Sequence, residues 1–224
     1  MGDGGLRAFA ALSVVTGRVL KRSFFDRPAA AVAPDLLGCV VEHETAEGLV
    51  AVRLTEVEAY QGDLDPGSHA YRGLTPRNSI MFGEPGYVYV YFTYGMHYCM
   101  NLVCDGAGTA AAVLLRAGEV IEGIELATLR RGSSSRDLAR GPARLTVALG
   151  VGRAEYGLDA CDPASPLRVH REGSRSPGRV LTGPRVGLSA GAETPWRFWL
   201  DGEPTVSPYR AAVEKRRPAK PFER

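Results

Sequence analysis

Two glutamates lie two positions apart in the segment Glu56-Val57-Glu58-Ala59-Tyr60. In an extended strand this spacing places both carboxylates on one face, because successive side chains point to opposite faces. A carboxylate at the end of a strand beside an aromatic ring can activate a water molecule, a role worth about 10²- to 10⁴-fold in rate. The alternative reading is that both glutamates are solvent-facing charges.

A long loop is expected directly after these carboxylates, from Gln61 to Pro85, because Gly, Pro and Asp recur throughout it. Loops longer than about 12 to 15 residues in a compact domain are often functional. This one carries His69, Arg77 and Asn78. A lone histidine is more often a surface group than a catalyst, so His69 gains weight only from its neighbours.

The segment YVYVYFTYGMHY, residues 87–98, holds five of the chain's nine tyrosines. Its alternation predicts a strand with Tyr87, Tyr89 and Tyr91 on one face and two valines on the other. Plain sheet packing would explain this pattern, and so would a pair of inward rings that sandwich a flat ligand. Tyr94 follows the alternation beside Gly95, so its ring is expected to project from a turn, where it can wedge between stacked bases.

The elements that position these residues are predicted to form one α+β domain, with a mostly antiparallel, curved β-sheet core flanked by helices. Strands are expected over residues 39–43, 49–59, 87–91, 101–104 and 111–117, with shorter ones near RVGLS (185–189) and RFWLD (197–201). Helices are expected over 28–37, 119–131 and 142–149. The domain is predicted to span 19–207, between a loose leader (1–18) and a basic, poorly ordered tail (208–224).

Composition places the 224-residue chain among ordinary globular proteins, with 45% hydrophobic residues, 23% charged residues and a net charge of +2. These values exclude a disordered chain, and the charge alone does not indicate nucleic acid. No segment reaches the roughly 20 apolar residues of a membrane span. We therefore expect a monomer without a membrane partner, located in the cytoplasm (the cytosol or nucleoid of a bacterium).

The supply of nucleophiles and metal ligands is limited. The three lysines lie near the termini, at positions 21, 215 and 220, so the middle of the chain has no amine for Schiff-base chemistry. The four cysteines show no C-x-x-C spacing, which favours buried free thiols over metal ligands. We expect no metal and no cofactor. The densest basic segment outside the tail fits a solvated face or a phosphate-binding face equally well; its arginines are Arg130, Arg131, Arg136, Arg140 and Arg144.

Several motifs occur together in one order: TEVEAYQG, TPRN followed by MF, GYVYVYFTYGMHYCMN, and VLLRA. In their order and spacing they resemble the alkyladenine (3-methyladenine) DNA glycosylase family, whose members excise damaged purines. The likeness extends from FFDRPA (24–29) through GPARL and RVGLS to PWRFWLDG, which is most of the chain. Agreement among several separate motifs is far more specific than one short match.

The resemblance implies a role for each matching residue. Glu58 would orient and deprotonate the attacking water, and Arg116 would support that water. Asn101 would discriminate against the exocyclic amine of guanine, and Tyr94 would fill the gap that an extruded base leaves in the duplex. Tyr60 and His69 would stack on and contact the extruded base, Tyr91 would form the other face of that sandwich, and Leu114 would line the pocket. Candidates for loop support or contacts to the DNA backbone are Arg77, Asn78, Met81 and Arg144.

The physical logic agrees with the resemblance. Flipping a base out of a duplex costs a few kcal/mol, and an aromatic stack worth about 1 to 3 kcal/mol per base is large enough to offset that cost. Alkylation at N3 or N7 makes a purine cationic, which suits electron-rich rings and departure of the base. Without a central lysine, water is the expected nucleophile. This predicts a monofunctional repair enzyme that acts on alkylated or deaminated purines in duplex DNA and leaves an abasic site uncut.

Two rival readings belong to other classes. In one, the tyrosines stack bases in a binding module without catalysis. In the other, Glu56 and Glu58 form the acid and nucleophile pair of a sugar hydrolase, since their Cβ atoms would lie about 6.5 to 7 Å apart on a strand. Neither rival explains Asn101, Arg116 and TPRN at their spacing. Differences from vertebrate members, two extra residues between Asn101 and Arg116 and a histidine at His97 in place of tyrosine, concern the range of lesions more than the reaction.

Overall fold

A computed structural model describes residues 17–93, 95–132, 137–171 and 178–212. Its strands are β1 (Arg18–Val19), β2 (Val40–Thr45), β3 (Gly48–Gln61), β4 (Val88–Thr93), β5 (His97–Cys104), β6 (Ala111–Glu122), β7 (Leu167–Arg171), β8 (Val180–Gly183) and β9 (Arg197–Leu200). Its helices are α1 (Arg22–Phe25), α2 (Ala29–Leu36), α3 (Ile124–Arg131) and α4 (Pro142–Leu149), with 3₁₀ turns at Gly62–Leu64, Ser79–Phe82 and Arg153–Glu155.

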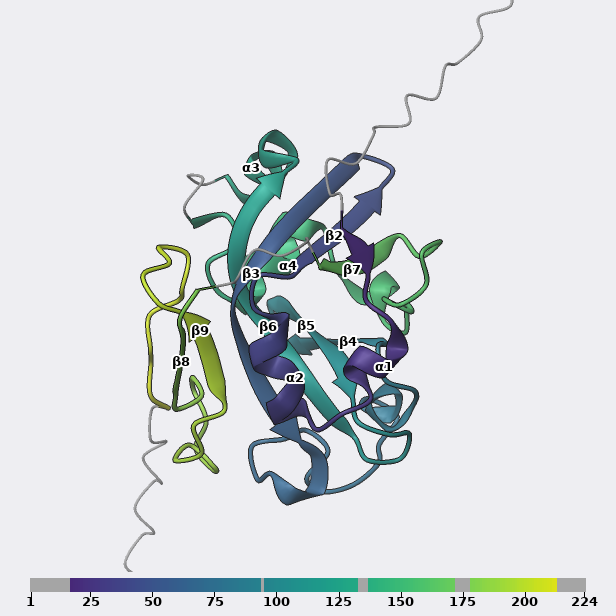
Figure 1. The fold of residues 1–224 in the computed structure, drawn as a ribbon, viewed down its shortest axis with the longest axis vertical. Coiled ribbons are helices and arrows are strands. Elements are labelled where there is room, and N and C mark those ends of the chain that lie inside the picture. Colours follow the sequence, from purple (N-terminus) through teal and green to yellow (C-terminus); the bar gives the residue numbers. More distant parts are fainter. Residues whose placement is uncertain (1–16, 94, 133–136, 172–177, 213–224) are drawn as a thin grey trace, which may run out of the picture.

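The strands form one antiparallel sheet in the order β1-β7-β2-β3-β6-β5-β4, to which the β8–β9 hairpin is joined through β9. The long strands β3 and β6 curve side by side through the middle of the molecule, and the β8–β9 hairpin lies at one edge (Figure 1). The predicted class, a single α+β domain with a curved antiparallel sheet and flanking helices, is confirmed.

Strand β3 organises the sheet because three strands pair with it. β6 pairs along one edge from Ala51 to Gln61, while the other edge is divided between β2, which pairs with Gly48–Arg53, and β9, which pairs with Glu56–Glu58. The β3–β6 register shifts between Leu54 and Glu56 and again between Glu56 and Val57. Irregularities of this kind redirect side chains and are frequent beside active sites.

The alternation in β4 separates two apolar clusters. Val88 and Val90 join the main core, which also holds the buried faces of α2 and α4. Tyr89 belongs to a second cluster, against which Tyr87 and Tyr91 pack. The predicted division of tyrosines and valines between the two faces is confirmed, and Tyr89, only 1% exposed, is buried in the second cluster.

Two predicted boundaries are wrong. The helix expected from Glu119 begins at Ile124, because β6 continues to Glu122. Gly123 then turns the chain with φ 71°, where an added Cβ would lie 2.1 Å from the carbonyl oxygen of Leu49. No strand forms at RVGLS itself, where residues 186 and 187 form a turn; the strand expected near it is β8, which ends at Gly183.

The two ends of the chain extend beyond the described residues, whereas all four cysteines lie within them. Most of the predicted leader and tail lies outside the described residues, so the domain limits stay a prediction. Cys39, Cys99 and Cys104 are buried and free, as expected, and Cys161 is a partly buried free thiol. None of the helices in the described ranges combines the length and the apolar character needed to cross a bilayer.

Candidate active site

A cavity of about 360 Å³ lies where β3, β4, β5 and β6 meet the loop after β3 and the turn at residues 186–188. This volume is in the range of small-ligand pockets. The structure brings together seven of the side chains singled out in the sequence, and all of them line this cavity: Tyr60, His69, Met81, Tyr91, Asn101, Leu114 and Arg116. They come from three strands of the sheet's centre, from β4 and from the loop.

Aromatic rings make up one wall of the cavity. The His69 and Tyr91 rings meet edge to face with centroids 4.4 Å apart, and His69 Nδ1 lies 3.1 Å from the hydroxyl of Tyr89. Because His69 and Tyr91 are in contact, a flat ligand cannot lie between them in this arrangement. A planar base in the cavity could therefore have the Tyr91–His69 pair on one side and Tyr60 on the other, since Tyr60 also lines the cavity.

The ionisation of these rings suits a neutral pocket. Desolvation among the rings, and secondarily the charge of Arg77, lowers the pKa of His69, so the imidazole is uncharged at neutral pH. Burial raises the pKa of Tyr60 well above 10, and the neighbouring carboxylate of Glu58 raises it further. Tyr60 is therefore a stable hydrogen-bond donor, and its hydroxyl donates to Glu58 Oε2 at 2.8 Å.

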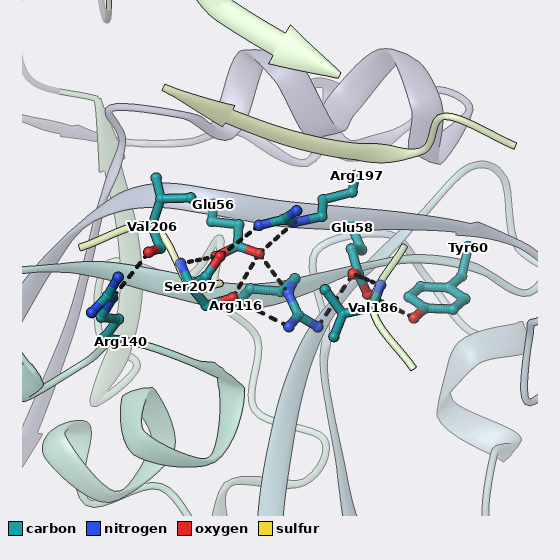
Figure 2. Close-up of polar contacts among 9 residues, drawn as sticks. All are labelled: Glu56, Glu58, Tyr60, Arg116, Arg140, Val186, Arg197, Val206 and Ser207. Atoms are coloured by element: carbon teal, nitrogen blue, oxygen red, sulfur yellow. Dashed lines mark hydrogen bonds and ion pairs between the residues drawn. The ribbon is translucent and has the colours of Figure 1, made fainter. Parts of the chain in front are cut away.

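Glu58 is fully buried and lies directly behind the cavity wall. Its Oε1 accepts a hydrogen bond from the backbone N–H of Val186 at 2.7 Å and lies 3.2 Å from Nη1 of Arg116. All three of its polar partners, Tyr60, Arg116 and Val186, line the cavity, and Figure 2 shows them around the carboxylate. The reading of Glu58 as a solvent-facing charge is therefore wrong.

Arg116 reaches both glutamates because of the irregular pairing of β3 with β6. Val57 pairs with Leu115 and Glu56 with Ala117, so Arg116 is the extra residue between two pairs. Its Nε donates to Glu56 Oε1 at 2.8 Å. Burial alone would lower the pKa of Arg116, but the two carboxylates outweigh burial and raise it, so the guanidinium remains charged.

Glu56 is also fully buried, and it does not line the cavity. Burial would raise its pKa, but Arg116, Arg197 and hydrogen bonds from Ser207 outweigh burial and lower it. Glu56 is thus ionised near neutral pH. Its contribution to stability is present above the unfolded-state pKa and is lost as the pH falls through the lowered folded-state pKa.

The loop after β3 is held by its own polar groups. Asn78 is 2% exposed, accepts a hydrogen bond from the N–H of Thr75 and donates to the carbonyl oxygens of His69 and Gly73. These contacts favour loop support over DNA contact for Asn78. Arg77 is exposed, donates to the carbonyl of Phe92 at 3.0 Å and lies over the Tyr91 ring, so it borders the aromatic wall.

A buried arginine behind the cavity was assigned no role from the sequence. Arg185 forms a two-pronged ion pair with Asp65 and donates to the carbonyl of Ala59. Its guanidinium lies 4.6 Å from the centroid of the Tyr60 ring and 5.3 Å from that of Trp196. It therefore fixes Tyr60 from behind and anchors the turn that carries Val186. In the sequence, the RVGLS motif was the one signal in this segment, and it was interpreted wrongly as a strand.

The basic segment mostly makes internal contacts. Arg130 binds Glu47 and the carbonyl of Ala148, and Arg140 binds the carbonyl of Val206. Arg144 is the more exposed, with 48% of its side chain accessible, and follows Pro142 and Ala143 at the cavity. Arg136 lies outside the described residues, and so does Tyr94, whose predicted wedge role stays a prediction.

Tyr89 and His97, both noted in the sequence, also line the cavity. Other lining groups gave no clear signal in the sequence: Gly67, Thr93, Cys99, Pro142, Ala143, Gly187 and Leu188. Asn101 is 4% exposed and donates from Nδ2 to the carbonyl of Tyr89 at 3.1 Å, which fixes its amide at the cavity. Within the described ranges no three His, Cys, Asp or Glu side chains gather as a metal site would require. The expectation of no metal or cofactor stays a prediction.

Comparison with known proteins gives consistent results. Residues 23–204 match the sequence profile of a family described as methylpurine-DNA glycosylase. A protein of Streptomyces avermitilis is 59% identical over 202 residues, which cover 88% of this chain and 95% of that protein. One from Leifsonia xyli subsp. xyli is 57% identical over 80% of this chain and 87% of its own length, and one from Burkholderia lata is 48% identical over 85% and 92%. All three bear the name "Putative 3-methyladenine DNA glycosylase".

Proposed function

The chain belongs to the methylpurine-DNA glycosylase family, and from this premise we propose that it flips alkylated or deaminated purines out of duplex DNA and hydrolyses their N-glycosidic bond with a water activated by Glu58. As a DNA glycosylase it is a hydrolase of N-glycosyl bonds. The observation that carries the mechanism is the position of Glu58 behind three groups that line an aromatic cavity. The product is an abasic site in an uncut strand.

The attacking water is proposed to reach Glu58 between Tyr60, Arg116 and Val186. In the described structure Oε2 accepts one hydrogen bond, from Tyr60, and an ionised carboxylate oxygen can accept two. Glu58 would take the proton of that water and stabilise the positive charge that develops on the sugar as the bond breaks. Arg116 holds the carboxylate in place through Nη1 and supports the water.

The extruded base is proposed to lie between Tyr60 and the Tyr91–His69 pair, with Leu114 and Asn101 at its edges. Stacking worth about 1 to 3 kcal/mol per base offsets the few kcal/mol that flipping costs. The fixed amide of Asn101 would disfavour a base that presents an exocyclic amine there. Tyr94 is proposed to fill the space that the base leaves in the duplex, and Arg77 and Arg144 to contact the backbone.

The geometry argues against both rival functions. A sugar hydrolase would need Glu56 as its acid or nucleophile, but Glu56 is fully buried, away from the cavity, and its lowered pKa disfavours a proton donor. A binding module without catalysis gives no reason to bury Glu58 behind the groups that a ligand would touch. Burying a carboxylate is costly unless it is well paired.

The direct test is base release from duplex oligonucleotides that each hold one defined lesion. The panel contains 3-methyladenine, 7-methylguanine, hypoxanthine or ethenoadenine. We expect a free base and an intact strand that breaks only on alkaline treatment of the abasic site. Borohydride should trap no covalent protein–DNA adduct, since no lysine lies between positions 21 and 215. A trapped adduct would contradict the water mechanism, and absence of release from every lesion would contradict the function.

The neutral state of His69 gives a prediction for pH. Protonating this ring would place a positive charge beside a cationic base, and like charges about 4 Å apart repel by about 4 kcal/mol in a partly solvated site. Because the pKa of His69 is lowered, the preference for cationic over neutral lesions should hold at pH 7 and fall at least about tenfold at pH values below the His69 pKa.

The measurement is the ratio of kcat/KM for 7-methylguanine and hypoxanthine between pH 7.5 and about 5, in which any titration shared by both substrates cancels. His69→Asn can retain a contact with Tyr89 but cannot gain a charge. Its ratio should not follow pH as the wild-type ratio does. Equal pH dependence in the two proteins would rule out His69 as the source.

A further inference from the structure

Glu56, the first carboxylate of the Glu-x-Glu segment, has four hydrogen-bond donors around it. Glu56 Oε1 accepts hydrogen bonds from Nε of Arg116 at 2.8 Å, Nε of Arg197 at 2.7 Å and Oγ of Ser207 at 3.0 Å, and its Oε2 accepts one from the N–H of Ser207 at 2.7 Å. Three of these donors converge on Oε1 and one binds Oε2. Because Glu56 is fully buried and does not line the cavity, it cannot act as an acid or base on a ligand there, but it can fix its neighbours.

Buried ion pairs often stabilise a fold no more than apolar residues of similar volume would. Removing two charges from water costs several kcal/mol per ion, and apolar residues of similar volume often replace such groups without loss. Glu56, Arg116 and Arg197 are at most 6% exposed. A role in orienting the adjoining site would explain why charged groups, and not apolar residues, occupy this position.

Arg116 connects this cluster to the site. Its Nε faces Glu56, its Nη1 faces Glu58 at 3.2 Å, and its Nη2 lies 3.4 Å from the hydroxyl of Ser207 (Figure 2). A guanidinium is planar and its N–H groups have fixed directions. Once Glu56 and Ser207 hold one edge of the group, the direction in which Nη1 points at Glu58 is determined.

The cluster also balances charge. The carboxylates of Glu56 and Glu58 are matched by the guanidiniums of Arg116 and Arg197, so the four formal charges sum to zero. Removing Glu56 leaves one excess positive charge near Glu58, and removing Arg197 leaves one excess negative charge. The other titratable or charged groups that face Glu58 from neighbouring elements are Tyr60, Tyr91, Cys99 and Arg185.

We propose that Glu56 is a positioning residue for base release: with Arg197 and Ser207 it fixes Arg116 against Glu58 and keeps the charge around Glu58 balanced. This inference rests on the proposed role of Glu58 as the base that activates water. It assigns to Glu56 no contact with substrate.

The test compares the pH dependence of single-turnover base release in two variants with opposite changes in charge. Glu56→Gln should lower the rate about 10- to 100-fold by misplacing Arg116 and move the acidic limb of the profile about one unit to lower pH. Arg197→Gln should move the limb about one unit to higher pH. The double variant restores the balance, so its limb should return to the wild-type position while its rate stays low.

Glu119→Gln is the matched control, because it makes the same chemical change on β6 at a half-exposed glutamate that pairs with Arg53. Its rate and profile should equal those of the wild type. If Glu56→Gln does not fold, as judged by thermal melting, Glu56→Asp replaces it; this shorter side chain keeps the charge, so the rate should fall without movement of the limb.

The possible results distinguish failure of the positioning role from failure of the proposed function. If the acidic limb of the pH profile stays in place, or moves in the same direction in both single variants, the positioning role is overturned, while base release by the wild type still supports the glycosylase function. A Glu56→Asp variant with an unchanged rate would overturn it too. If the wild type releases no base from any lesion, the proposed function itself fails.

Discussion

Glu58→Gln is expected to reduce base release by at least about 10²- to 10⁴-fold, which is the usual contribution of a general base. The loss has two causes, because glutamine can neither take a proton from water nor stabilise the cationic sugar through a negative charge. Glutamine keeps the shape of the side chain, and its oxygen can still accept the hydrogen bond from Val186. Single-turnover release from a 7-methylguanine duplex measures the change.

Binding provides the control for this variant. Affinity for a duplex with a preformed abasic site should stay within a few-fold of the wild type, because the rings of the cavity and the exposed Arg77 and Arg144 are unchanged. Glu119→Gln should retain full activity, since Glu119 lies away from the cavity. Near-normal release by Glu58→Gln would remove Glu58 from the mechanism, whereas loss of binding together with release would indicate a damaged fold.

Asp65→Asn is expected to lower the free energy of unfolding by about 3 to 5 kcal/mol, the usual cost of removing one partner from a buried ion pair. Asp65 and Arg185 are each 1% exposed, and the variant would leave the Arg185 guanidinium charged without its ion-pair partner. Arg185 also packs on Tyr60. The pocket should therefore lose order along with stability, and urea unfolding at pH 7 measures the stability change.

An exposed ion pair supplies the matched control. Asp35 binds Arg27 at 2.9 Å, and about half of the Asp35 side chain is accessible. Asp35→Asn should change the free energy of unfolding by no more than about 1 kcal/mol, because exposed pairs contribute little. Equal effects at the two sites would contradict the importance assigned to the buried pair. An unchanged slope against urea concentration would show that both variants unfold in the same manner.

Local sequence patterns predict the parts of the fold that local chemistry determines. The alternation of tyrosine and valine in β4 follows from the two apolar clusters that the strand separates. Pro142 and Gly150 mark the limits of α4. The start of α3 was missed because Val120 and Glu122 fit a helix as well as a strand, and the turn at Gly123 depends on the closeness of Leu49 in a strand far earlier in the chain.

In the candidate site, too, some features could be predicted from the sequence and others could not. Resemblance of motifs identified Tyr60, His69, Tyr91, Asn101 and Leu114, which line one cavity. Burial of Glu58 could not be predicted, because a Glu-x-Glu pattern on a strand is equally compatible with an exposed face.

The supports of the site were missed because their partners are distant in sequence. Asp65 and Arg185 are 120 positions apart, and Glu56 and Ser207 are 151 positions apart. The residues next to each partner in the sequence give no indication of such a pairing. The pairings form only when β9 pairs with β3 and brings the segments before and after β9 close to the β3 end of the sheet.

The distance between Glu56 and Ser207 has a consequence for biosynthesis. As the polypeptide leaves the ribosome, β3 emerges long before the segment whose N–H and hydroxyl complete the shell of Glu56. A nascent chain halted before residue 207 would contain every side chain that lines the cavity and still lack the last donors that hold Arg116. If Glu56 positions Arg116 as proposed, a product truncated before residue 207 would keep the residues of the cavity lining but release a damaged base more slowly than the full chain.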